Sequence, residues 1–174
     1  MNRVMVMGVS AGVGKSTFAK ELGKRMQIPV HHLDAYYWKP GWEEVSYEEF
    51  LARQHELIAC NKWWIIEGNY TQTYTIRAKN ADTIIYLELP LYVCLYRVIK
   101  RRLFYHGRTR PDMGEGCKEK LDMEFLRFIC STYYPRKKKM KDRFVAFQEG
   151  NPSNKVIVLK SRKEIRSYLE TLHS

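Results

Sequence analysis

The sequence predicts an α/β fold in which a mainly parallel sheet is covered by helices on both faces. Short apolar runs alternate with helical stretches, and a glycine-rich segment joins the first run to the first helix. The chain has 174 residues, enough for one domain with a sizeable core. We therefore expect a single domain over residues 1–174.

The order of the elements follows from the apolar spacing. Residues 2–7 predict a buried strand that stops at Gly8, and residues 15–26 predict a helix because Phe18, Leu22 and Met26 share one face. Ser46, with Glu49 three residues later, predicts the start of a second helix. The remaining strands are expected at residues 29–34, 63–70, 82–90 and 155–160, before a last amphipathic helix around residues 165–172.

The segment "GVGKST" between the first strand and the first helix is suited to holding phosphate. Glycines let backbone N–H groups converge on an anion, and the helix start adds the positive end of its dipole. Lys15 would reach the β- and γ-phosphates of a nucleotide, and the Ser16 hydroxyl would bind Mg²⁺. The alternative is a glycine-rich turn with a surface lysine.

One position departs from the phosphate-loop pattern G-x-x-x-x-G-K-[ST]. Val9 stands where that pattern has its first glycine, and Gly8 precedes it by one residue. Either Gly8 closes the turn, which we favour, or Val9 adopts a strained backbone conformation that glycine usually takes.

Two acids lie at predicted strand ends, where ligands bind in parallel sheets. Glu67 ends the third strand and is a candidate for orienting Mg²⁺, although it could instead pair with a nearby base. Asp34 ends the second strand and could accept a proton, hold substrate or metal, or cap a turn. The adjacent His31 and His32 point to opposite faces of a strand, so we expect hydrogen-bonded or packed side chains rather than a metal site.

Charge and cysteine usage limit the classes of protein. The net charge of +11 suits a polyanionic ligand, either a nucleotide or a nucleic acid. No apolar run approaches the roughly 20 residues that a membrane helix needs. Because no signal-peptide pattern occurs and no cysteine pair has metal or redox spacing, we expect a cytoplasmic protein with no membrane partner. The cysteines are Cys60, Cys94, Cys117 and Cys130.

Several segments occur in an order that resembles a known family. They are "SAGVGKST", "HLDAYYWKPGW", "WWIIEGNY", "ADTIIYLELP" and "KRRLFYHGRTRPDMGEGC". Over residues 4–172 the chain resembles the FlaR-type topology modulation proteins, which belong to the P-loop nucleoside and nucleotide kinase superfamily and are similar to adenylate kinase in layout. The resemblance implies a three-layer P-loop fold with a sheet of order 2-3-1-4-5.

The resemblance also implies ATP and Mg²⁺ as cofactors and a short lid at about residues 101–116. The nucleotide would bind at Ala11, Gly12, Val13, Gly14, Lys15, Ser16 and Thr17. Arg101, Arg108 and Arg110 match the arginine pattern of such lids and would stabilise the transferred phosphoryl group, the alternative being a solvated helix face and turn.

The acceptor side has candidates of its own. Arg77 lies where nucleoside monophosphate kinases bind the acceptor phosphate, or else it is a surface helix arginine. Trp38 and Trp42 could stack on a planar acceptor or fold over the edge of the core. With Lys15 and Asp34 as further catalytic candidates, the first hypothesis is a kinase of a small-molecule acceptor, of nucleoside or nucleotide type.

The second hypothesis is a nucleic-acid-binding regulator that uses the phosphate loop as a nucleotide sensor. Its contact surface would be the run "PRKKKMKDR" at residues 135–143, which is otherwise a solvated helix surface. We expect a small-molecule acceptor as the partner in preference to nucleic acid.

Overall fold

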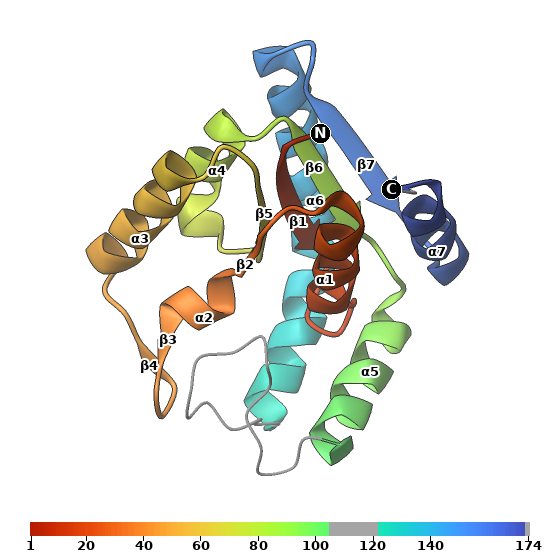
Figure 1. The fold of residues 1–174 in the computed structure, drawn as a ribbon. Helices are drawn as coiled ribbons and strands as arrows, with labels where there is room; N and C mark the ends of the chain where they lie inside the picture. The colour runs from red at the N-terminus through yellow and green to blue at the C-terminus, as the bar shows by residue number, and fades with distance from the viewer. Residues whose placement is uncertain (105–121, 173–174) are drawn as a thin grey trace.

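The computed structural model describes residues 1–104 and 122–172. Its centre is a parallel five-stranded sheet of order β2-β5-β1-β6-β7 (Figure 1). Counted along the chain within this sheet, the order is 2-3-1-4-5, which confirms the expectation. The strands are β1 (Arg3–Gly8), β2 (Val30–His32), β5 (Trp64–Glu67), β6 (Thr83–Leu87) and β7 (Lys155–Leu159).

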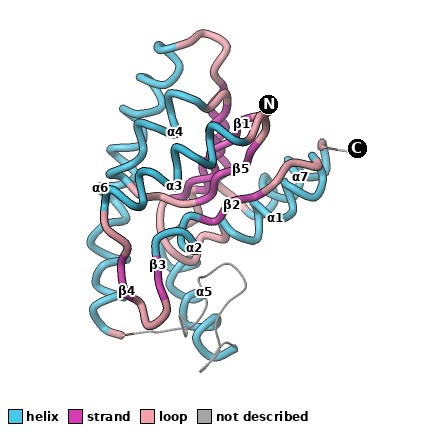
Figure 2. The backbone as a smooth tube through the Cα atoms, turned by 60° about the vertical axis from the view of Figure 1, so that its left-hand side comes forward, coloured by secondary structure: helices cyan, strands magenta, loops and turns pink. Residues whose placement is uncertain are grey.

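Helices cover both faces of the sheet (Figure 2). On one face, α1 (Lys15–Met26) contacts β1, β2 and β5, and α7 (Arg162–Thr171) contacts β7 and α1. On the other face lie α3 (Tyr47–Cys60), α4 (Tyr74–Asn80) and the long α6 (Met123–Gly150). Since both faces are covered, β1, β5 and β6 are buried almost throughout, which explains why they read as continuous apolar runs.

Helix α5 (Leu91–Phe104) follows β6, and its first turns lie against the loop after β1. The predicted helix start at Ser46 is confirmed, because the Glu49 N–H donates to Ser46 Oγ at 3.1 Å. None of the helices within residues 1–104 and 122–172 combines the length and apolarity needed to cross a bilayer.

The region between β2 and α3 differs from the prediction. β2 ends at His32, and Asp34 lies in the first turn of the short helix α2 (Leu33–Tyr37) rather than at a strand end. A small antiparallel pair, β3 (Trp38–Lys39) and β4 (Glu43–Glu44), then carries the aromatic segment. Only two residues on each strand form this pair, too few for alternating apolar residues to reveal it in the sequence.

Candidate functional site

The phosphate loop, Val9 to Gly14, connects β1 to α1 and has glycine where its backbone requires it. Gly12 and Gly14 have φ values of 76° and 101°, which side chains rarely adopt. A Cβ atom on Gly12 would also lie 2.3 Å from the carbonyl oxygen of Cys94 in α5. Glycine at position 12 therefore allows both the turn and the close packing of α5 against it.

Val9 is not strained. It is fully buried, and the described non-glycine residues with positive φ are Gln27 and Trp42. At Gly8, a Cβ atom would lie 2.5 Å from Cγ1 of Val13 and 3.0 Å from Cγ of Lys15. Gly8 thus allows the loop to fold back over the end of β1, so the alternative of a strained Val9 was wrong.

Three polar side chains from distant parts of the chain hold the phosphate loop. The Arg97 guanidinium of α5 donates to the Val13 carbonyl at 2.8 Å, and that of Arg136 in α6 donates to the Val9 carbonyl at 3.1 Å. The Asn69 amide accepts from the Gly8 N–H at 3.0 Å and donates to the Gly8 carbonyl at 2.9 Å. These contacts fix the loop from outside its own sequence.

None of these three residues was predicted as a site residue. Arg97 lies in a basic span in which only other arginines were expected to act in the lid. Arg136 lies in the run expected to be a solvated helix surface. Burial lowers the pKa of both guanidinium groups, and Arg162 lowers that of Arg97 further. The only sequence signal for Asn69 was its place two residues after the predicted strand-end acid.

Ser16, Glu67 and His32 form a polar cluster beside the phosphate loop. Ser16 Oγ donates to Glu67 Oε2 at 3.2 Å, and His32 Nδ1 lies 2.8 Å from the same oxygen. Glu67 is 4% exposed at the end of β5. Glu67 therefore pairs with a nearby base, and the same carboxylate oxygen also reaches the hydroxyl that is expected to bind metal. His32 is the residue of this cluster that the sequence analysis set aside.

Oxygen atoms of Ser16 and Glu67 are of the kind that Mg²⁺ prefers. No group of three or more His, Cys, Asp or Glu side chains suited to a metal occurs among the described residues. A cation between the phosphate loop and β5 would therefore depend on these two oxygens together with phosphate oxygens.

Asp34 lines the same cleft and accepts a hydrogen bond from the Tyr70 hydroxyl at 2.7 Å. Burial raises the pKa of Tyr70, and the neighbouring Asp34 raises it further, so Tyr70 remains a donor. Its ring packs against Tyr37 and Phe50, with ring centroids 4.9 Å from each. This aromatic cluster orients the hydroxyl that in turn holds Asp34.

Arg77 holds the loop after β5, residues 68–70, which carries Tyr70. Its side chain is fully buried, and it donates to the carbonyls of Gly68 and Tyr70 at 3.0 and 2.8 Å. Burial lowers its pKa to about 10, with a further contribution from Arg143. Arg77 is thus not a surface arginine, and it is not among the residues that line the cleft.

The cleft between these parts has a volume of about 1430 Å³. That volume exceeds the roughly 300–1,000 Å³ usual for a single small ligand. The predicted residues that line it are Ala11 to Thr17, Asp34, Trp38, Glu67 and Arg101. Trp42 lines it too, with its ring centroid 5.3 Å from that of Trp38.

Further cations line the cleft beside Arg97 and Arg136. They include Arg162 and Arg166 of α7, which the sequence analysis did not single out. Arg108, Arg110 and most of the expected lid lie outside the described residues.

The sequence matches no protein family model and no curated protein. Solved structures are similar over almost the whole chain. A shikimate kinase from Bacteroides thetaiotaomicron is 18% identical over 98% of this chain and 95% of that chain, with a TM-score of 0.53. A gluconokinase from Sinorhizobium meliloti 1021 is 14% identical over 98% and 91%, with a TM-score of 0.54.

A sugar kinase from Janibacter sp. HTCC2649 is 16% identical over 100% of this chain and 99% of that chain, with a TM-score of 0.51. At identities this low, the structural similarity shows a common architecture only. The chemistry has to be argued from the residues of the site. The chain therefore has the α/β fold of these kinases.

Proposed function

We propose that the chain is an ATP-dependent kinase that transfers the γ-phosphoryl group to a small molecule. The observation that carries this proposal is the convergence of the phosphate loop, the Ser16–Glu67 pair and Asp34 on one cleft. Phosphoryl transfer needs positioning and charge stabilisation more than covalent chemistry, and these parts supply both. The fold shared with shikimate, sugar and gluconate kinases supports the same class.

On the donor side, the backbone of residues 11–17 would hold the nucleotide phosphates. Gly12 and Gly14 keep this backbone clear of side chains, and Lys15 at the start of α1 would contact the β- and γ-phosphates. Ser16 and Glu67 would hold Mg²⁺, with His32 fixing the carboxylate. When bound, Mg²⁺ would neutralise charge on the phosphates.

On the acceptor side, Asp34 would take the proton of an acceptor hydroxyl. The acceptor oxygen then forms a bond to the γ-phosphorus, the bond from that phosphorus to the bridging oxygen breaks, and ADP leaves. Tyr70 orients Asp34 from one side, and Trp38 and Trp42 give the acceptor an aromatic wall. Arg97 and Arg101 of α5 line the region where negative charge develops.

Arg108 and Arg110 are proposed to join these cations on the strength of the family resemblance alone.

We do not infer an action on DNA from the resemblance to FlaR-type proteins. The cations of the basic run 135–143 do not form one surface patch, because several of them have partners within the protein. Arg136 bonds to the phosphate loop, and Lys137 pairs with Glu88 at 3.0 Å. Arg143 packs over the ring of Tyr74, 4.0 Å from its centroid. These contacts leave a weaker solvent-facing patch than the sequence suggests.

The proposal is tested by incubating the protein with γ-labelled ATP and Mg²⁺ against a panel of hydroxy acids, sugars, nucleosides and nucleotides. We expect transfer to at least one acceptor and its loss in Lys15→Ala. Lys24→Ala is a matched control, since Lys24 is an exposed lysine on the same helix that does not line the cleft. Absence of both ATP binding and transfer over the whole panel would refute the kinase.

A further inference from the structure

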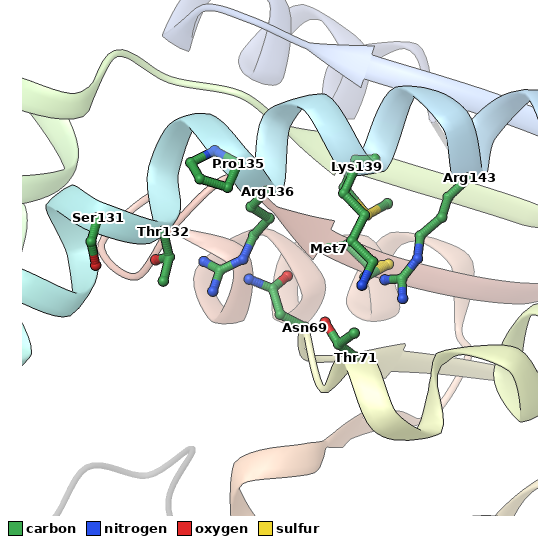
Figure 3. A pocket seen from close by; sticks show the side chains of 10 residues that line it. Met7, Asn69, Thr71, Ser131, Thr132, Pro135, Arg136, Lys139 and Arg143 are labelled. Carbon is green, nitrogen blue, oxygen red and sulfur yellow. The ribbon is translucent and has the colours of Figure 1, made fainter.

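A second cavity, of about 390 Å³, lies between α6 and the loop after β5. It shares Asn69, Thr71 and Arg136 with the main cleft, so the two spaces adjoin. Figure 3 shows basic side chains extending from α6 toward Asn69 and Thr71. The cavity is large enough for a small molecule with one charged group and a short body.

Three of its lining residues are cations from consecutive turns of one helix. Arg136, Lys139 and Arg143 follow each other at spacings of three and four residues, which places them on one side of α6 (Figure 3). None of the described residues that line this cavity is acidic. No salt bridge joins any of the three to an acid within residues 1–104 and 122–172.

Two of these cations are also partly withdrawn from water. Burial lowers the pKa of Arg136 and of Arg143. The fully buried Arg77 is close enough to Arg143 for their like charges to lower the Arg77 pKa. Arg136 bonds to the Val9 carbonyl and Arg143 packs over the Tyr74 ring, but neither contact supplies a counter-charge. An anion between these gathered like charges would offset the cost of holding them together.

The neutral groups of the cavity are suited to a phosphate. The Asn69 amide and the Thr71 hydroxyl face the three cations and add hydrogen-bonding capacity, while Met7 and Met140 provide an apolar wall. A phosphate monoester carries close to two negative charges and several acceptor oxygens, whereas a carboxylate carries one charge. Three cations therefore match a phosphate better than a carboxylate.

We propose that this cavity is a binding site for the phosphate group of a small phosphorylated molecule, separate from the nucleotide cleft. Lys139 and Arg143 line this cavity and not the cleft, so they define a site of its own. Asn69 and Arg136, its other polar groups, bond to Gly8 and Val9. An anion bound here would therefore contact the same side chains that hold the phosphate loop. The site does not depend on the chain being a kinase.

The test is calorimetric titration of inorganic phosphate in a Lys15→Ala background, which weakens phosphate binding at the loop. We expect one bound phosphate, with an affinity about ten-fold lower in Lys139→Gln, since one charge-assisted contact corresponds to roughly that factor. Lys138→Gln should leave the affinity unchanged, because Lys138 is as exposed as Lys139 but does not line the cavity. Arg143→Gln should weaken binding similarly, and thermal unfolding with circular dichroism identifies any variant that fails to fold.

Three results would overturn the proposal. One is the absence of phosphate binding in the folded protein. Another is an equal loss of affinity in Lys138→Gln and Lys139→Gln, which would indicate general surface charge. The third is succinate binding as tightly as phosphate, which would mean that the cavity selects carboxylates. A failure of the kinase proposal is recognised separately, by the acceptor panel.

Discussion

The phosphate loop and the loop after β5 lie side by side at one cleft, because they follow adjacent strands, yet they depend most on different contacts. In the phosphate loop, Gly12 leaves space for backbone packing and adopts a conformation that side chains disfavour. The loop after β5, residues 68–70, is fixed by side chains: Arg77 bonds its carbonyls, and Tyr37 and Phe50 clamp Tyr70. Loss of space at Gly12 should therefore damage the first loop, and loss of the Arg77 donor the second.

The largest expected effect is that of Gly12→Ala. The positive φ costs about 1–2 kcal/mol, and the contact with the Cys94 carbonyl adds about 1–3 kcal/mol of overpacking. We expect a lower free energy of unfolding in urea and a lower affinity for ATP. Gly41→Ala is the matched control, because Gly41 has a φ of 82° but no atom within 4 Å of its Cβ position. Equal losses in the two variants would contradict the role of close packing.

Arg77→Met should destabilise the loop after β5. One buried and one partly buried carbonyl lose their donor, which costs about 2–4 kcal/mol in total. Thermal and urea unfolding measure this loss, and Lys79→Met, on an exposed position of the same helix, should change stability little. A stable Arg77→Met variant with an unaltered loop would show that the two hydrogen bonds are not required.

Glu67→Gln tests the place where the two loops meet. The substitution keeps the shape of the side chain but removes the charge that Ser16 and His32 contact. We expect about a 10- to 100-fold weaker affinity for Mg²⁺ in the presence of a non-hydrolysable ATP analogue, measured by titration. Glu88→Gln is a control at another strand-end acid, one that pairs with Lys137 outside the phosphate loop. If both variants bind Mg²⁺ as the wild type does, Glu67 is not a ligand.

The smallest expected effect is that of Tyr70→Phe. The ring and its packing remain, and only the hydrogen bond to Asp34 is lost. A single hydrogen bond to a charged group contributes about 1.5–3 kcal/mol at most. We expect kcat to fall by about ten-fold while KM for ATP stays constant, and Tyr36→Phe, which leaves Asp34 untouched, should retain full activity. A change in KM for ATP alone would place Tyr70 on the donor side.

The same contrast explains what the sequence predicts well. The strands, the first helix and the glycine segment follow from residues close together in the chain, and all were predicted. The order of the strands in the sheet was expected from the family resemblance alone. Asp34 and Glu67 were found because they end or directly follow apolar runs. These signals are local, and periodicity with turn chemistry is enough to detect them.

The missed residues act through long-range contacts. Arg136 is 127 positions from the carbonyl it bonds, and Arg97 is 84 positions from its own. Arg77 was a candidate for binding the acceptor phosphate, and the fold instead buries it against the carbonyls of Gly68 and Tyr70. Charge runs usually belong to solvated surfaces. For this reason Arg136 and Arg143 of α6 were expected to face solvent, whereas they contact the protein interior.

The central claim is that the groups proposed for the donor and those proposed for the acceptor share one cleft and act separately. Asp34→Asn tests it most directly, with ATP affinity and phosphoryl transfer measured on the same preparation once the acceptor panel has supplied a substrate. Removal of a general base lowers the rate by about 10²–10⁴-fold. We predict that loss in kcat together with unchanged ATP affinity. Full transfer activity in Asp34→Asn, or loss of ATP binding along with transfer, would contradict the account.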